Sequence, residues 1–471
     1  TVVATSLPAM VGELHGIEHL SWVVAAYLLT ATAATPVYGK LSDIYGRSAL
    51  FRSAIAIFLL GSIACGAAHS MSQLIAGRTL QGLGGGGLIS LAMTIIADIV
   101  PPRERGRYQA YFTSVWSSAT IGGPMLGGFL VDWLSWRWVF WINLPIGIAA
   151  IAICSAALKR LPRRGRSAPL DVAGVVLMVP AIVALLLVTT WGGTVFAWRS
   201  PQVMGLIVVS AILLALLVRR ERRAPDPLLP PRLFANNVVV VGNALAFLSG
   251  VVSVGSVIFL PLFLQTVIGV TAANSGLLIM PYMLGITVSS TACGRLIRRT
   301  GRYRLYPIAG FAAAAVAFLC FVWVGRGTPP LLYSAAMALL GIGIGPMGPA
   351  VTVAVQNAVE LRDMGTATSL TSFFRSMGGS FGVALLGAIL LAGLAGATGL
   401  DSGGLLHGGP TMLAALPAAV RATVVAAFAR SFVALYLVGA GLCAIAVAAA
   451  FLLEELPLKS RLPGQPAGNP D

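Results

Sequence analysis

Charged residues are scarce in this chain. Only 10% of its 471 residues are Asp, Glu, Lys or Arg, whereas a soluble globular domain carries about 25%. Hydrophobic residues make up 57%, and the mean hydropathy is +0.89. Apolar runs of about 20 residues, each long enough to cross a bilayer core, recur along the whole length. We therefore expect an all-α polytopic membrane protein surrounded by the lipid bilayer.

Histidine and cysteine, which build most metal and nucleophilic sites, are also few. The four histidines form no cluster with Asp or Cys, and the five cysteines lie far apart without a Cys-x-x-Cys pair. The sequence therefore predicts no disulfide framework, no metal site and no cofactor. A membrane enzyme is disfavoured because no catalytic constellation is visible. A nutrient-sensing receptor is a second rival, which should lack transport activity.

Lysine contributes only three of the 31 basic residues, which give the chain a net charge of +16. Basic chains can bind nucleic acid, but these charges are divided among short loops and accompany no nucleic-acid-binding motif. We therefore expect no nucleic-acid partner. The preference for Arg, together with abundant Ala and Gly, is typical of a GC-rich bacterial genome.

Fourteen apolar runs are expected to form membrane spans. They cover residues 1–14, 21–39, 48–68, 72–98, 107–131, 137–158, 170–191, 201–218, 237–265, 272–297, 304–325, 331–357, 364–394 and 429–453. The first run has only about 10 apolar residues, too few to cross the membrane alone. We therefore expect the sequence to begin inside its first helix.

The placement of basic residues predicts the orientation of these spans. If the first helix starts in the cytoplasm, twenty-four basic residues fall on the inner side, five on the outer side and two inside spans. This asymmetry agrees with the positive-inside rule. It predicts a multi-pass protein of the bacterial inner membrane, with segment 395–429 outside and the C-terminal tail in the cytoplasm.

Two pairs of motifs indicate an internal duplication. "GKLSDIYGR" begins at Gly39 and "GRLIRRTGR" begins at Gly294, while the pair 122–123 has a counterpart at 378–379. Both separations are close to 255 residues, which indicates two parallel six-helix halves with two extra helices between them. The predicted organisation is an N-terminal half 1–158, two inserted linker helices within 159–235, a C-terminal half 236–453 and a tail 454–471.

The loop motif "GKLSDIYGR" combines turn residues with a charged pair. Gly39 and Gly46 allow a tight turn. Asp43 is an anion that can face a helix N-terminus or pair with a nearby Arg such as Arg47. An ordinary solvated loop is the alternative interpretation.

Two arginines lie inside spans, where a charge is costly and marks a functional site by default. Arg78 belongs to "LIAGRTLQGLGGGG", and Gln81 follows it three residues later on the same helix face. A structural Arg78 bonded to carbonyl groups is the alternative. Arg375, in "SFFRSMGGSFG", is the candidate in the second half.

The stretch "SSATIGGPMLGGFLVDWL" contains helix breakers inside a span. Ala119, Gly123 and Gly127 are four residues apart, so they form one flat face against which a neighbouring helix can pack. Pro124 removes a backbone hydrogen bond and should kink the helix. Gly128 completes the pattern.

These motifs, in this order, resemble the major facilitator superfamily, and specifically its fourteen-span drug:proton antiporter family. The resemblance implies that Asp43 and Arg47 latch the two halves together on the cytoplasmic side, with Asp98 as partner. It assigns proton coupling to Arg78, accompanied by Gln81. It also implies that residues 119–128 form a tightly packed, bendable helix at the boundary between the halves.

The family resemblance implies a proton-coupled secondary transporter that exports hydrophobic or cationic drugs by alternating access. The alternative is a dedicated exporter of a single lipid, antibiotic or other metabolite. Coupling needs a carboxylate, and none lies near mid-membrane in the predicted spans. In the family this acid belongs to the first helix, so we expect it just upstream of Thr1. Glu13, at the outer end of that helix, is the substitute candidate.

Overall fold

The computed structural model describes residues 2–14, 19–158, 169–193, 195–325, 327–398 and 417–458. Its regular secondary structure is helical, apart from one isolated β-bridge between Gly192 and Phe196. The all-α class expected from the sequence is therefore confirmed for the described part of the chain. Residues 399–416 of segment 395–429 and the tail after residue 458 lie outside these ranges.

The first half consists of α1 (Val2–Leu14), α2 (Leu20–Tyr45), α3 (Arg47–Gly66), α4 (Met71–Ile99), α5 (Pro102–Trp133), α6 (Trp138–Trp141) and α7 (Asn143–Leu158). Local chemistry explains where these helices begin and end. Gly46 separates α2 from α3 with a φ of +91°, a conformation that favours glycine. The Ser70 side chain caps α4 by accepting a hydrogen bond from the backbone N–H of Gln73.

The remaining helices belong to the expected insertion and to the second half. They are α8 (Val172–Trp191), α9 (Pro201–Glu221), α10 (Pro231–Ala235), α11 (Asn237–Phe263), α12 (Ala272–Leu278), α13 (Met280–Thr300), α14 (Leu305–Val322), α15 (Pro330–Ile344), α16 (Met347–Ala358), α17 (Met364–Thr398) and α19 (Ala418–Phe451). A five-residue π-helix, Leu264–Ile268, extends α11. Pro346 separates α15 from α16, because proline has no backbone N–H with which to continue the hydrogen bonding of a helix.

Twelve helical segments of the described residues are long and apolar enough to cross a membrane. The other two of the fourteen expected spans are α1 and α5. The first has only 13 residues in helical form. The second is 32 residues long, but polar residues and glycines interrupt its apolar runs. The chain is thus a multi-pass membrane protein, while the count of fourteen spans remains a prediction.

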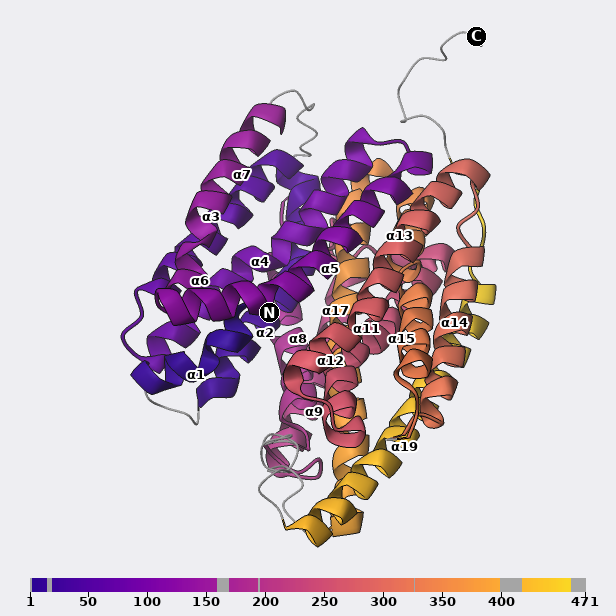
Figure 1. Ribbon diagram of the computed structural model, residues 1–471. Helices are drawn as coiled ribbons and strands as arrows, with labels where there is room; N and C mark the ends of the chain where they lie inside the picture. Colours follow the sequence, from indigo (N-terminus) through magenta and orange to yellow (C-terminus); the bar gives the residue numbers. More distant parts are fainter. Residues whose placement is uncertain are drawn as a thin grey trace.

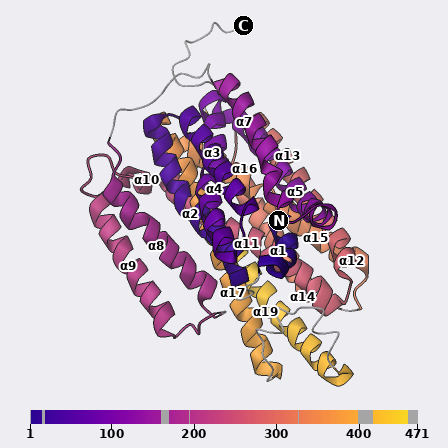
Figure 2. The same ribbon diagram turned by 90° about the vertical axis from the view of Figure 1, so that its left-hand side faces the viewer.

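The two halves lie side by side, as Figure 1 shows with the first half in indigo and purple and the second in orange and yellow. Helix α2 packs against α17 and α5 packs against α13, with smaller contacts of α4 with α17 and of α5 with α16. Helices α8 and α9 form a hairpin at one side, visible in Figure 2, where α8 packs against α2 and α17. The inserted pair therefore contacts both halves.

The two glycines that begin the repeated motif lie where these helix pairs cross. A Cβ added at Gly39 of α2 would lie 2.6 Å from the Cβ of Ser369 in α17. A Cβ added at Gly294 of α13 would lie 2.3 Å from the carbonyl oxygen of Gly106 in α5. The two glycines that begin the repeated motif are therefore the close crossing points between the halves. Only residues without side chains allow this backbone approach.

The largest apolar cluster belongs to the second half and contains an aromatic stack. The ring of Phe263 lies 5.2 Å from that of Phe432 and 5.4 Å from that of Tyr436, measured between centroids. Phe321 stacks on Tyr436 at 5.2 Å. These contacts join α11, α14 and α19, so aromatic packing holds these three helices together.

Candidate functional site

The turn between α2 and α3 brings two charged side chains of the loop motif together. Asp43 lies in the last turn of α2 and Arg47 is the first residue of α3. The guanidinium of Arg47 donates to Asp43 Oδ1 and, over 3.2 Å, to Ser42 Oγ. The glycine turn at Gly46 therefore produces a local ion pair, which the four-residue spacing permits.

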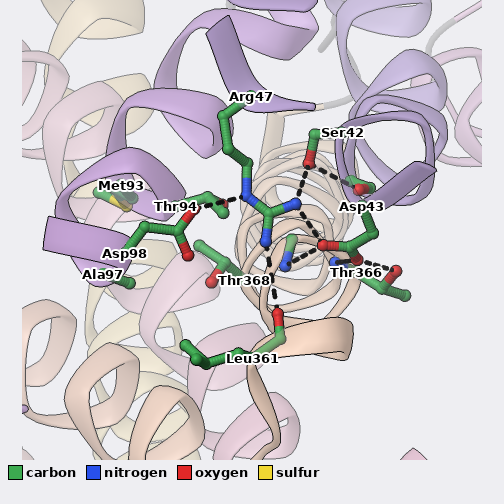
Figure 3. A network of polar contacts seen from close by, with 12 residues as sticks. Ser42, Asp43, Arg47, Met93, Thr94, Ala97, Asp98, Leu361, Thr366 and Thr368 are labelled. Carbon is green, nitrogen blue, oxygen red and sulfur yellow. Dashed lines mark hydrogen bonds and ion pairs between the residues drawn. The ribbon is translucent and has the colours of Figure 1, made fainter. Parts of the chain in front are cut away.

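Arg47 connects this turn to two further elements (Figure 3). Its Nε donates to Asp98 Oδ2, at the end of α4, over 3.0 Å. Its second terminal nitrogen lies 3.5 Å from the carbonyl oxygen of Leu361, directly before α17. The planar fork of one arginine thus contacts both halves of the molecule.

The carboxylate of Asp43 reaches the N-terminus of α17. Asp43 Oδ1 accepts a hydrogen bond from the backbone N–H of Gly365 over 3.0 Å. Asp43 Oδ2 accepts from the backbone N–H of Thr366 over 2.9 Å and from its hydroxyl over 2.8 Å. The first N–H groups of a helix lack partners within it and carry partial positive charge, so an anion is stabilising there.

We call this network of Ser42, Asp43, Arg47, Asp98, Leu361, Gly365 and Thr366 the interdomain latch. Its three charged side chains are 7–14% exposed, so water screens them weakly. The structure therefore brings together Asp43, Arg47 and Asp98, the three residues that the family resemblance groups. Gly46 forms the expected turn. The turn expected at Gly39 is wrong, because Gly39 lies inside α2, where it allows the close crossing with α17.

Sequence reasoning missed two ion pairs that attach the inserted segment to the latch. Lys40 Nζ, buried on α2, lies 2.7 Å from Asp226 Oδ1 in the segment after α9. Arg232 of α10 contacts both carboxylate oxygens of Asp363, with Nε 2.9 Å from Oδ2 and a terminal nitrogen 2.8 Å from Oδ1. Asp363 directly precedes α17, so the inserted segment is attached to both halves beside the latch.

Arg105 was also missed, although it is almost fully buried. It donates to the carbonyl oxygens of Ala97 over 2.6 Å and Val100 over 3.0 Å, at the end of α4. It also lies 3.4 Å from the carbonyl oxygen of Gln356 in α16. Burial lowers the pKa of the Arg105 side chain to about 10. No sequence signal marks this role, because Arg105 stands in a basic motif, "RERGR", that also suits a solvated loop.

Arg78, on α4, has hydrogen-bond and aromatic partners for its buried guanidinium. Its Nε donates to the carbonyl oxygen of Val23 over 3.0 Å, a terminal nitrogen donates to Gln81 Oε1, and its guanidinium lies 4.3 Å from the centre of the Tyr27 ring. Gln81 in turn donates to Ser62 Oγ over 2.7 Å. The predicted pairing of Arg78 with Gln81 is present, and no carboxylate accompanies it within the described residues.

Glu13 has its own basic partner. Glu13 Oε1 lies 2.6 Å from a terminal nitrogen of Arg137, and Glu13 Oε2 accepts from the indole nitrogen of Trp136 over 2.6 Å. Arg137 also donates to the carbonyl oxygen of Ala68. These contacts indicate a structural role for Glu13, which links the end of α1 to the residues directly before α6. The coupling role assigned to Glu13 stays a prediction.

The small-residue face of α5 is only partly as expected. Gly123 and Gly127 are buried, and α5 continues as a helix through Pro124. Ala119 is exposed, however, and a Cβ added at Gly128 would have no neighbour within 4 Å. The tight packing predicted for Ala119 and Gly128 is therefore wrong. Four-residue spacing identifies a flat face but not which part of it another helix covers.

Comparison with known proteins gives one consistent result. Residues 1–383 match the family model described as Major Facilitator Superfamily. An uncharacterized MFS-type transporter of Mycobacterium tuberculosis is 39% identical over 463 residues, with 97% of this chain and 67% of the relative covered. The multidrug transporter protein MdtP of Bacillus subtilis is 36% identical over 394 residues, covering 83% and 72%.

Two solved structures share the fold. A human organic anion transporter superposes with a TM-score of 0.60 at 16% identity, covering 96% of this chain and 89% of that one. The proton:xylose symporter XylE gives a TM-score of 0.59 at 13% identity, covering 95% and 90%. At these identities the likeness concerns the fold alone.

Proposed function

The chain belongs to the major facilitator superfamily, and we propose that it is a proton-coupled secondary transporter that exports hydrophobic or cationic drugs. Two relatives from Bacillus subtilis that are 36% and 34% identical carry the names multidrug transporter and multidrug resistance protein. We assign the chain to the fourteen-span drug:proton antiporter family of the bacterial inner membrane, with its C-terminus in the cytoplasm. The proposed organisation is a first half 1–158, an insertion 159–235, a second half 236–453 and a tail.

The observation that carries this proposal is the interdomain latch. Asp43 caps a helix of the opposite half, so its three hydrogen bonds break when the halves separate at this end. In alternating access by rocking halves, such contacts exist in one conformation and are lost in the other. The latch therefore acts as the cytoplasmic gate. Because its contacts form only in the conformation closed at this end, they favour that conformation over the open one.

Proton coupling is assigned to the buried cluster around Arg78. An intramembrane arginine held by a carbonyl, an amide and an aromatic ring is a fixed positive charge. A nearby carboxylate would gain or lose its proton according to its distance from that charge and from water. Gln81, bonded to both Arg78 and Ser62, keeps the guanidinium in place.

A dedicated exporter of one metabolite is the second candidate. The Acurin A biosynthesis cluster MFS-type transporter of Aspergillus aculeatus is 31% identical over 395 residues and covers 83% of this chain. Because one fold serves both purposes, the latch does not separate the candidates. A panel of unrelated dyes separates them. Transport of several dyes supports the multidrug proposal. Transport of one native product and of none of the dyes supports the alternative.

The direct test of the multidrug proposal uses intact cells. Expression of the chain should lower the accumulation of a cationic dye, and a protonophore should abolish the difference. Cells with the Asp43→Asn variant, expressed at the same level, should accumulate more dye than cells with the wild-type chain. Equal accumulation with and without the wild-type chain would reject the proposal.

A further inference from the structure

The two arginines inside spans have opposite surroundings. Arg78 is held by a carbonyl oxygen, an amide oxygen and an aromatic ring. The Nε atom of Arg375, in α17, is buried without a hydrogen-bond partner, and the described residues supply neither an ion pair nor a ring contact to its guanidinium. Since a charge in an apolar environment is costly unless it is paired, Arg375 lacks the compensation that Arg78 has.

The guanidinium of Arg375 lies against the first turn of α16. A Cβ added at Gly348 would be 3.0 Å from one terminal nitrogen, 3.7 Å from Cζ and 3.8 Å from the other nitrogen. The N-terminal end of a helix carries partial positive charge, which repels a cation and attracts an anion. Two positive groups therefore lie side by side, and a side chain larger than glycine at position 348 would crowd the guanidinium.

Among the residues that the structure describes, no carboxylate forms an ion pair with Arg375. Between residues 237 and 453, Glu360, Asp363 and Asp401 are the acidic residues, and none lies inside an expected span. Arg375 is the one charged residue in α11, α16 or α17. At the repeat offset of 256 residues, the equivalent position in the first half is Ala119, so the duplicated helix does not need an arginine to fold.

We propose that Arg375, beside Gly348 and the N-terminal turn of α16, binds the anionic group of an amphipathic organic anion such as a sulfonate or carboxylate. The surrounding helices are apolar, so the rest of the ligand must be apolar too. Arg375 is partly exposed, and Nε alone among its guanidinium nitrogens is fully buried without a partner, so the two terminal nitrogens remain within reach of a ligand. This site extends the proposed substrate range beyond cationic compounds and does not depend on proton coupling.

Equilibrium binding to the purified full chain in lipid nanodiscs tests this site. The probes are a naphthalene-sulfonate dye, its uncharged sulfonamide analogue and the cation ethidium. Wild-type protein should bind the sulfonate at least tenfold more tightly than the sulfonamide, because a charge-assisted hydrogen bond contributes about that factor. Arg375→Gln should remove this preference, and Arg375→Lys should keep part of it, since Lys retains the charge without the planar fork.

Two further variants separate a binding role from a structural one. Gly348→Ala keeps every charge but places a methyl group against the guanidinium, so sulfonate binding should weaken several-fold. Arg421→Gln, at the exposed start of α19, removes one positive charge elsewhere and should bind like wild type. Equal sulfonate affinity in wild type and Arg375→Gln overturns the proposal, and so does an equal loss for all three probes. Binding needs no proton gradient, so failure of proton-driven transport leaves this test intact.

Discussion

Asp43 and Thr366 are 323 residues apart in sequence, yet the carboxylate of Asp43 accepts two hydrogen bonds from Thr366, one from its backbone N–H and one from its hydroxyl. The contact joins the end of α2 to the start of α17, and therefore the first half to the second. Because Gly365 donates to the other oxygen of the same carboxylate, one side chain holds a helix end of the opposite half.

Asp43→Asn should slow dye efflux about tenfold without lowering the amount of protein in the membrane. The amide keeps the shape of the side chain but loses the charge that faces the α17 N-terminus and Arg47. Efflux is measured in cells with matched expression. Thr366→Val, which removes only the hydroxyl donor, should have a smaller effect than Asp43→Asn. Normal efflux by Asp43→Asn would show that the latch does not control transport.

Arg78→Ala should abolish proton-driven efflux, and Arg78→Lys should restore only part of it. Arg78 uses two different nitrogens for Val23 and Gln81 and one ring face for Tyr27, a set of contacts that a single ammonium cannot reproduce. Efflux under an imposed pH gradient measures the loss. Wild-type rates in the Ala variant would favour a purely structural arginine.

Gly123→Leu should destroy transport, whereas Gly128→Leu should be tolerated. Gly123 is buried in α5, so a large side chain must push a neighbouring helix away. Gly128 lies on the same helix, where an added Cβ meets no atom within 4 Å. Comparing the two variants for expression and efflux controls for the loss of a glycine. Full activity of Gly123→Leu would mean that no neighbouring helix needs to pack closely against Gly123.

Lys40→Met should lower the thermal unfolding temperature of the purified protein by a few degrees. It leaves Asp226, which is 16% exposed, without its cation, and an uncompensated buried charge is destabilising. The double variant Lys40→Met/Asp226→Leu should recover most of the loss, because removing both partners leaves no unpaired charge. Scanning fluorimetry measures both. A double variant no more stable than the single one would indicate that the ion pair is not the cause.

Local motifs predicted part of the latch, and distant partners had to come from the structure. The spacing of Asp43 and Arg47 around Gly46 indicates their pairing, and the family resemblance adds Asp98. Nothing near Gly365 or Thr366 marks them as donors, because backbone N–H groups belong to every sequence. Nothing in the sequence marks Lys40 as buried, since its burial depends on the distant segment that contains Asp226. Ala119 and Gly128 fit a helical spacing that does not reveal where the neighbouring helix ends.

Uptake of a cationic dye into inside-out proteoliposomes with an acidic lumen tests the central claim of proton-coupled export most directly. Protons leaving the lumen should drive dye inward, and the account predicts accumulation above that of protein-free liposomes. The accumulation should disappear on adding a protonophore and should be strongly reduced for Arg78→Ala. Dye movement that is equal with and without the pH gradient, or equal in protein-free liposomes, would contradict it.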